Sequence, residues 1–291
     1  MQDQDLIRPG WRGATRTVNG VTLHVVEAGE QGRPLLILLH GFPEFWWAWR
    51  NQITPFADAG FHVVVPDMRG YNHSDKPQDV AAYHIDTLAS DVVALADTYG
   101  AERFHLVGHD WGAIVTWWTA ARYPERLDRV VVMDGPHPDV WSRQAMRHPT
   151  QALRSTYVAF FQLPWVPEAT LGGLNYAGLK AMMGGSARPG TFKPDELQRY
   201  VTAWSRPGAL TAMLNYYRAL RDRPAGDPPA RLSPPTLVLW AGQDSFLERH
   251  VAEAGLALCD NGELVVIDAC HWLHIEQFRR VNAEILGFLA G

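Results

Sequence analysis

The stretch Leu106-Val107-Gly108-His109-Asp110-Trp111-Gly112-Ala113 decides the fold of this chain. It joins a short β-like run, residues 104–107, to a helix-like run, residues 113–122. The two glycines allow a sharp, strained turn from strand to helix, which presents one side chain at the edge of a sheet. A serine at the centre of this pattern would indicate acyl transfer. The carboxylate of Asp110 indicates displacement at a saturated carbon instead, with an alkyl ester as the intermediate.

The composition limits the classes of protein to consider. With 291 residues and 47% hydrophobic residues, the chain has enough apolar material for one large α/β domain with an insertion. Its net charge of −5 gives no basic footprint for nucleic acid. Residues 1–5 are acidic and polar, unlike a signal peptide, and the longest apolar run, Leu35 to Leu39, is too short to span a bilayer. Cys259 and Cys270 suit a reducing cytoplasm, although a pair does not exclude a disulfide.

Apolar, strand-like runs alternate with helical patterns over much of the chain. This alternation predicts a mostly parallel sheet that is covered by helices on both faces. The predicted strands are 22–26, 35–39, 62–66, 104–107, 129–133, 236–240 and 263–267, and the clearest helices are 85–99, 113–122 and 275–289.

The pattern changes between residues 139 and 223. Strand signals vanish there, helical spacing dominates, and glycine or proline pairs interrupt the segment at 172–173, 184–185 and 189–190. We interpret this segment as a helical cap inserted after the sixth strand. The predicted division is a core domain of residues 1–138 and 224–291 and a cap domain of residues 139–223.

Four motifs carry a resemblance to a known family. His40-Gly41-Phe42-Pro43-Glu44 follows a strand, and it is accompanied by Trp47-Ala48-Trp49-Arg50, Asp67-Met68-Arg69-Gly70-Tyr71 and Gly108-His109-Asp110-Trp111-Gly112. Together they resemble the α/β-hydrolases of the epoxide hydrolase group, from about residue 15 onward. The resemblance implies an α/β-hydrolase fold, with a mostly parallel eight-stranded sheet flanked by helices and a helical cap after the sixth strand. It implies no metal and no organic cofactor.

The segment from His40 to Pro43 resembles the oxyanion-hole loop of that family. The resemblance assigns the backbone N–H groups of Phe42 and Trp111 to the oxyanion that forms when water attacks the Asp110 ester. The plainer interpretation is a turn with a cis proline at Pro43, and the two interpretations are compatible.

The base and its orienting acid each have a rival in the sequence. His271 resembles the family's base, with Cys270 in place of the usual glycine, and His274 is expected to be a capping or surface residue. Asp244, in a Gly-x-Asp turn after a strand, matches the acid of epoxide hydrolases. Asp134 follows the preceding strand, where some dehalogenases carry their acid. It is expected to be a polar neighbour of Asp244 or a substitute for it.

The proton donors to the leaving group are expected in the cap, because an opened epoxide becomes an alkoxide. Tyr157 precedes Gln162 by five residues, as in the first cap-tyrosine motif of the family, and Leu153, Tyr157, Phe160 and Phe161 share a helical stripe. The second motif and the helical periodicity both select Tyr217 over Tyr216. The predicted substrate-binding residues are Phe42, Trp111, Phe160, Phe161 and Trp165, which favour an apolar substrate.

Two other functions remain open at this point. A haloalkane dehalogenase would use the same Asp110, Asp244 and His271 with Trp111 as halide ligand, and Trp141, Trp165 or Trp204 would supply a second indole. A non-catalytic receptor for a small molecule would keep the pocket and lose turnover. The expected partners are an epoxide and water, without nucleic acid or membrane, and the expected form is a cytoplasmic monomer or homodimer that detoxifies epoxides.

Overall fold

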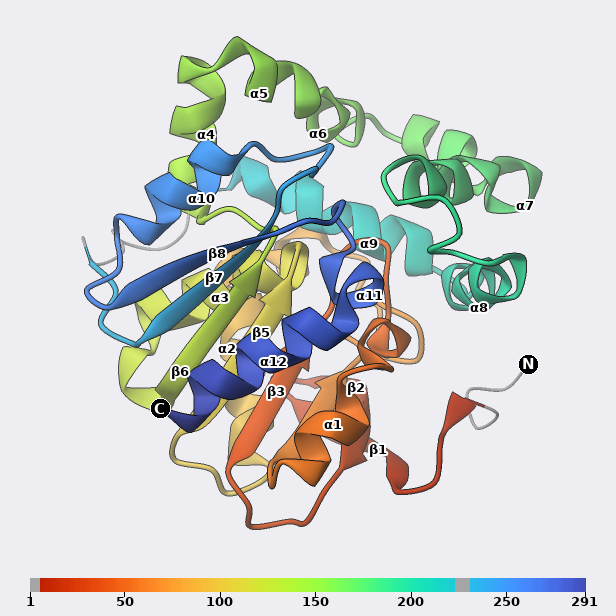
Figure 1. Ribbon diagram of the computed structural model, residues 1–291. Helices are drawn as coiled ribbons and strands as arrows, with labels where there is room; N and C mark the ends of the chain where they lie inside the picture. The colour runs from red at the N-terminus through yellow and green to blue at the C-terminus, as the bar shows by residue number, and fades with distance from the viewer. Residues whose placement is uncertain (1–5, 223–230) are drawn as a thin grey trace.

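The computed structural model describes residues 6–222 and 231–291, which build one sheet with helices on both faces (Figure 1). The strands lie in the order β1-β2-β4-β3-β5-β6-β7-β8. The β1–β2 and β2–β4 pairs are antiparallel, and the pairs from β4 to β8 are parallel. The strands are β1 (Trp11–Val18), β2 (Val21–Ala28), β3 (Leu35–Leu39), β4 (His62–Pro66), β5 (Phe104–His109), β6 (Leu127–Met133), β7 (Thr236–Ala241) and β8 (Gly262–Ile267).

The α/β-hydrolase fold predicted from the sequence is confirmed. The central strands β3 and β4 are buried along their whole length, and they read as continuous apolar runs because helices cover both faces of the sheet. Their bounds match the predicted strands. The eighth strand, β1, is absent from the predicted set because it is a half-exposed edge strand whose arginines and threonines break the apolar pattern.

Helices cover the two faces of the sheet, with α1 and α12 in front and α2 and α3 behind in Figure 1. The prediction of a single C-terminal helix over residues 275–289 is wrong in one respect. It is divided into two helices because the backbone of Gln277 leaves the helical region. The helices outside the β6–β7 connection are α1 (Ile53–Asp58), α2 (Ile85–Asp97), α3 (Trp111–Arg122), α10 (Arg249–Leu256), α11 (Leu273–Glu276) and α12 (Phe278–Ala290), with 3-10 turns η2 (Trp46–Trp49), η3 (Val80–Tyr83) and η4 (Pro124–Arg126).

The connection between β6 and β7 is helical, and Figure 1 shows it lying across one end of the sheet. The first of its helices begins at Pro138, next to the predicted start of the cap. The other predicted boundary, between residues 223 and 224, lies outside the described residues, as do residues 1–5. The helices are α4 (Pro138–Arg147), α5 (Pro149–Arg154), α6 (Thr156–Phe160), α7 (Val166–Gly185), α8 (Pro194–Trp204) and α9 (Ala209–Arg218), followed by η5 (Ala219–Arg221).

Two further observations bear on predictions from the sequence. Among the described residues, no helix combines the length and the apolar character needed to cross a membrane. Cys259 and Cys270 are both free thiols, so the disulfide that the sequence left open is not formed.

Candidate active site

Asp110 stands at the turn between β5 and α3. Its backbone has φ 51° and ψ −117°, a conformation that non-glycine residues seldom adopt, and the turn directs the side chain toward the cap. The flanking glycines are required by packing. A Cβ atom on Gly108 would lie 2.2 Å from the carbonyl oxygen of Gly112, and one on Gly112 would lie 2.2 Å from the carbonyl oxygen of Leu39. The sequence Gly-x-Asp-x-Gly therefore forms a nucleophile elbow.

The loop that follows β3 places a backbone donor on the Asp110 carboxylate. The N–H of Phe42 donates a hydrogen bond of 2.7 Å to Asp110 Oδ1. The Phe42–Pro43 bond is cis, as the sequence suggested. Trp111 is the first residue of α3, where backbone N–H groups lack acceptors within the helix. Of the two predicted oxyanion-hole residues, Phe42 thus contacts the carboxylate through its N–H, and Trp111 follows Asp110 at the start of α3.

His271 lies between two carboxylates. Its Nδ1 donates a hydrogen bond of 2.7 Å to Asp244 Oδ2, and its Nε2 lies 3.6 Å from Asp110 Oδ2. Burial lowers the pKa of His271, but the charges and hydrogen bonds of Asp244 and Asp110 outweigh burial and raise the pKa well above its usual value. The structure therefore brings together the three residues that the sequence predicted as nucleophile, base and acid.

Asp244 is held by its own turn after β7. Its Oδ1 accepts hydrogen bonds from the backbone N–H groups of Phe246 and Leu247, at 2.6 and 3.0 Å. The carboxylate is therefore fixed on one side by the backbone and on the other by His271. Of the two aspartates considered for the acid, this one contacts the imidazole.

Asp134 lies close behind this pair and is fully buried. Its Oδ1 accepts a hydrogen bond of 2.8 Å from the N–H of Ala241, and its Oδ2 has no hydrogen-bond partner. Burial, together with the charge of Asp244, raises the pKa of Asp134 well above its ordinary value. Asp134 is thus favoured as a neutral acid beside Asp244.

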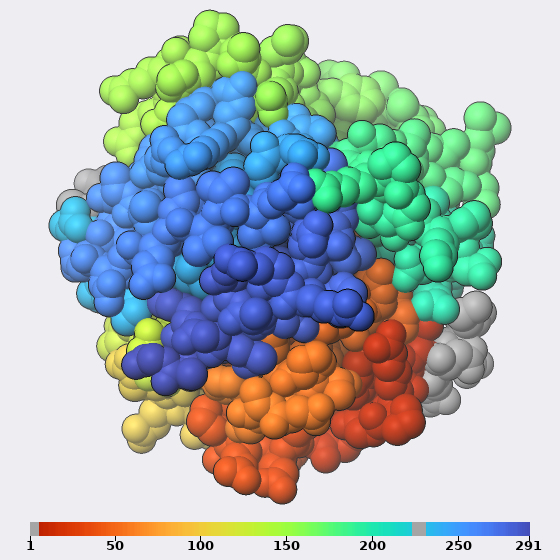
Figure 2. Space-filling model, in the orientation of Figure 1, coloured from red at the N-terminus to blue at the C-terminus, as the bar shows by residue number. Residues whose placement is uncertain are grey.

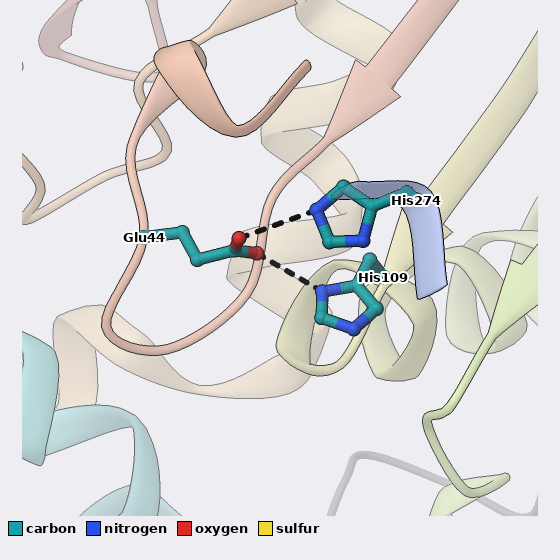
Figure 3. A group of neighbouring side chains, drawn as sticks. All are labelled: Glu44, His109 and His274. Atoms are coloured by element: carbon teal, nitrogen blue, oxygen red, sulfur yellow. Dashed lines mark hydrogen bonds and ion pairs between the residues drawn. The ribbon is translucent and has the colours of Figure 1, made fainter. Parts of the chain in front are cut away.

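A second group of titratable side chains lies behind the elbow, and sequence reasoning missed it (Figure 3). The buried Glu44 carboxylate lies between His109 and His274, 2.9 Å from Nδ1 of the first and 3.2 Å from Nε2 of the second. The expectation that His274 is a capping or surface residue is wrong, because α11 turns it into the interior. Burial lowers the pKa of His274 to about 4. The two histidines also outweigh the effect of burial on Glu44 and lower the pKa of its carboxyl.

His109 connects this group to the base. Its Nε2 lies 2.9 Å from the backbone carbonyl oxygen of His271, and its Nδ1 contacts Glu44. Both ring nitrogens therefore face oxygen atoms, one of the Glu44 carboxylate and one of the backbone. Atoms of Glu44, His109 and His274 that are able to bind a metal lie within 4.8 Å of one another, and their mutual hydrogen bonds account for the arrangement. Glu44 and His109 lie inside motifs quoted above, but their pairing depends on the fold.

Two tyrosines from the cap lie over the nucleophile. The ring of Tyr217, on α9, packs against Phe42 at 5.3 Å and Trp111 at 5.1 Å, and Tyr157, on α6, lies 6.0 Å from Tyr217. Burial raises the pKa of both phenols, and the negative charge of Asp110 raises it further. Tyr216 is placed differently because its hydroxyl donates to the carbonyl oxygen of Arg69. The structure therefore places the two predicted tyrosines together.

The other residues that the sequence predicted to bind substrate divide into two sets. Phe161 packs on Phe42 and Tyr217, at 5.5 and 4.9 Å, and belongs to the site, while Phe160 packs on Phe161 at 5.8 Å. Trp165 does not join them. It is 80% exposed because it precedes the first turn of α7.

Near α6 the structure corrects one prediction and adds one residue to the site. Leu153 is 72% exposed, because α5 ends at Arg154 and α6 begins at Thr156, so the predicted stripe is broken there. Phe246, which sequence reasoning missed, lies 5.6 Å from Tyr157 and 4.9 Å from His271. It closes the wall between the base and the cap.

The arrangement can perform a defined kind of chemistry. A partly buried carboxylate with one oxygen bound by a backbone N–H leaves its other oxygen for attack on carbon. The imidazole beside it, supported by a second carboxylate, suits activation of water, and the phenols opposite suit donation of a proton. These elements match a displacement followed by hydrolysis.

Comparison with known proteins gives a consistent result. The profile of a family described as alpha/beta hydrolase fold matches residues 34–278. The AB hydrolase superfamily protein YfhM of Bacillus subtilis is 45% identical over 272 residues, covering 93% of this chain and 95% of that protein. Human epoxide hydrolase 4 is 37% identical over 279 residues, covering 93% and 76%. The crystal structure of a Bacillus megaterium epoxide hydrolase with an inhibitor superimposes with a TM-score of 0.87 at 31% identity, covering 96% and 100%.

Proposed function

Since this chain belongs to the α/β-hydrolases, and within them to the epoxide hydrolase family, we propose that it hydrolyses an apolar epoxide to a vicinal diol through an ester of Asp110. The observation that carries this proposal is the position of the Asp110 carboxylate. One of its oxygens is bound by the Phe42 N–H, the other faces His271, and two phenols lie over it.

The first step forms the ester. Asp110 Oδ2 attacks one ring carbon of the epoxide, and the bond from that carbon to the ring oxygen breaks. The ring oxygen takes a proton from Tyr157 or Tyr217. The raised pKa of both phenols keeps them protonated before the reaction, so each remains a donor at neutral pH.

The second step releases the product. His271 removes a proton from water, and the resulting hydroxide attacks the Asp110 carbonyl carbon. The negative charge that develops on Oδ1 is stabilised by the Phe42 N–H, which already contacts that atom. Cleavage of the bond from the carbonyl carbon to Oδ2 releases the diol oxygen, which takes the proton of the added hydroxyl and leaves the carboxylate. The proton that His271 took from water then returns to the tyrosinate, so both side chains are restored as the diol leaves.

The substrate class follows from the walls of the site. Phe42, Trp111, Phe161 and Phe246 surround Asp110 with aromatic rings, so we propose an apolar or aromatic epoxide as the substrate. No group of this set would pair with a charge on the substrate. Styrene oxide is therefore a suitable first probe.

The test compares styrene oxide with 1-bromobutane, using the wild type and Tyr217→Phe. We expect diol from the epoxide, with turnover roughly 100-fold lower in the variant because one proton donor is lost. Bromide release that the substitution leaves unchanged, without any diol, would overturn the proposal. A single turnover in heavy-oxygen water should place the label in Asp110. Label in the first diol, and none in Asp110, would exclude the ester.

The haloalkane dehalogenase alternative is unsupported at two of its three candidate second indoles, and Trp141, which is partly buried, is the third. This alternative needs a second indole N–H beside Trp111, and the N–H of Trp204 already donates a 2.6 Å hydrogen bond to the carbonyl oxygen of Pro43. Trp165 is exposed to solvent. A receptor without turnover is also disfavoured, because the contacts among Asp110, His271 and Asp244 are those of a working base and nucleophile.

A further inference from the structure

A large groove lies away from the active site, between the core and the cap. It has a volume of about 900 Å³ and is lined by the N-terminal segment, η2 and the residues after it, the α7–α8 loop, α8 and α11. Figure 2 shows the face on which these segments, distant in sequence, come together beside the dark blue C-terminal helices. None of the residues assigned above to the reaction lines this groove.

The groove is positively charged although the chain carries a net charge of −5. Its lining includes the cations Arg8, Arg50, Arg188, Lys193 and Arg199 and two carboxylates, and Arg188 is also paired at 2.6 Å with Asp268 just outside the lining, which leaves an excess of two positive charges. Glu196 pairs with Arg50 at 2.8 Å, and Glu276 lies 3.8 Å from Arg188. Within the part of the chain that the structure describes, Arg8, Lys193 and Arg199 have no carboxylate partner.

Three guanidinium groups converge on one aromatic ring at the edge of this groove. Arg8, Arg50 and Arg199 lie 5.1, 5.6 and 4.8 Å from the ring centre of Trp47, which is itself buried. Burial, followed by the charges of Arg50 and Arg199, lowers the pKa of Arg8. The Nε–H of Arg199 is buried and has no acceptor. The aromatic ring offsets part of the mutual repulsion, but an anion would offset more.

The excess of charge favours a ligand with two negative charges. Guanidinium groups bind phosphate oxygens through paired N–H donors, and a concave site of one sign concentrates the field. We propose that this groove binds a phosphate dianion, either inorganic phosphate or a phosphomonoester, through the side chains of Arg8, Lys193 and Arg199. The remaining volume of the groove accommodates the organic part of a phosphomonoester.

The proposed ligands come from two parts of the fold. Arg8 precedes β1 and packs on Trp47 of η2, whereas Lys193 and Arg199 belong to the start of α8 and its body, in the cap. A bound dianion would therefore connect the cap to the core at a place remote from Asp110. Binding should raise the thermal midpoint as well as releasing heat.

The experiment is calorimetric titration of the full chain with inorganic phosphate and with glycerol phosphate, at constant ionic strength set by sodium chloride. We expect one phosphate per chain. Arg199→Gln should weaken binding about tenfold or more, as should Lys193→Gln at the exposed position. Arg33→Gln, which removes an exposed arginine paired with Glu30 elsewhere, is the matched control and should bind as the wild type does. At 100 times Kd, phosphate should raise the thermal midpoint by roughly 5 °C.

Two outcomes would contradict the proposal, and a further experiment identifies the source of the ligand. No heat of binding from the wild type at constant ionic strength would overturn the proposal. Unchanged affinity in the folded double variant Lys193→Gln/Arg199→Gln, with a normal circular dichroism spectrum, would overturn the location. Sedimentation with phosphatidic acid vesicles distinguishes the source. Binding to vesicles that free phosphate displaces supports a lipid headgroup in the groove, and binding of glycerol phosphate alone supports a soluble phosphomonoester.

Discussion

A single negative charge at Asp110 affects the protonation of His271. In the resting protein the imidazole faces carboxylates at both nitrogens, and both raise its pKa. Forming the ester would remove the charge of Asp110, so the pKa of His271 should fall at the moment when a base is required. The carboxylate thus serves as nucleophile first, and its loss then prepares the base.

Asp110→Asn should reproduce that change without a substrate. We expect the pKa of His271 to be lower in the variant than in the wild type, because only Asp244 then favours the imidazolium. Titration of the His271 ring protons by nuclear magnetic resonance measures both values. An equal pKa in the two proteins would show that Asp110 does not control the base. Asp128→Asn, at a surface ion pair with Arg103, is the control and should leave the titration unchanged.

Asp134 leads to a second prediction about single residues. One of its carboxylate oxygens lies in a group with His109 and His271 whose binding atoms are within 4.8 Å of one another, and its Oδ2 has no hydrogen-bond partner. In Asp244→Asn burial still raises the pKa of Asp134, but the contribution from the charge of Asp244 is gone, so the pKa should fall and Asp134 should support His271 in part. We expect turnover of styrene oxide to fall roughly 100-fold in Asp244→Asn and by a further tenfold or more in Asp244→Asn/Asp134→Asn. Equal rates in the two variants would contradict the prediction that Asp134 takes over part of the role of Asp244.

At the scale of the element, the start of α4 depends on a neutral histidine. Nδ1 of His137 accepts a hydrogen bond from the N–H of Asp139 and so caps the first helix of the cap. Burial, followed by the charge of Arg143, lowers the pKa of His137 to about 4. Protonation would remove the acceptor and place a positive charge at the N-terminus of a helix, where a cation is unfavourable.

This cap predicts a loss of stability in acid. A histidine whose pKa is lower in the folded state contributes stability that is complete above the unfolded pKa, near 6.5, and is lost as the pH falls through the folded value. For His137 that contribution is about 3 kcal/mol. His137→Asn keeps an acceptor that does not titrate. When the pH is lowered from 7 to 4.5, the free energy of unfolding of this variant should therefore fall by about 2–3 kcal/mol less than that of the wild type. Urea unfolding at both pH values measures this, and identical pH dependence in the two proteins would contradict it.

Elements were predictable from the sequence where burial left a clear pattern. Strands β3 and β4 are apolar throughout because both faces are covered, and their predicted bounds match. Strand β1 alternates polar residues at an edge, and the stripe through Leu153 crosses a break between α5 and α6 that no glycine or proline announces. The local pattern of apolar residues indicates which residues are buried. It does not predict an element that is exposed, or a turn of the chain within a helical run.

At the scale of the whole molecule, the cap contacts the oxyanion loop directly. The indole N–H of Trp204, at the end of α8, donates a 2.6 Å hydrogen bond to the carbonyl oxygen of Pro43, beside Phe42. The hydroxyl of Tyr216, on α9, donates to the carbonyl oxygen of Arg69. The position of the tyrosines above Asp110 is therefore linked to the loop that binds its carboxylate.

Trp204→Phe should weaken both stability and catalysis. Loss of the donor leaves the Pro43 carbonyl unpaired in a buried place, which should cost about 1–3 kcal/mol of unfolding free energy. A displaced loop should also lower kcat/KM roughly tenfold. Trp118→Phe is the control, because its N–H donates to Asp86 away from the site. It should lose stability but keep kcat/KM, and a similar loss of kcat/KM in both variants would contradict a specific role of the loop contact.

The candidate site could be predicted only where a motif carried it. Asp110, Phe42 and His271 stand in short motifs with a required geometry, and the structure brings them together. The pairing of Glu44 with His274 joins residues 230 positions apart, so no local pattern announces it. Trp165 was placed by its aromatic character alone, and its side chain faces solvent.

The neutral Asp134 beside Asp244 has a consequence for the history of such chains. If Asp134 supports His271 as predicted above, descendants that lose Asp244 would retain a weaker enzyme, and selection could then improve Asp134. The position of the acid is therefore free to drift between the ends of β6 and β7 through intermediates that all survive.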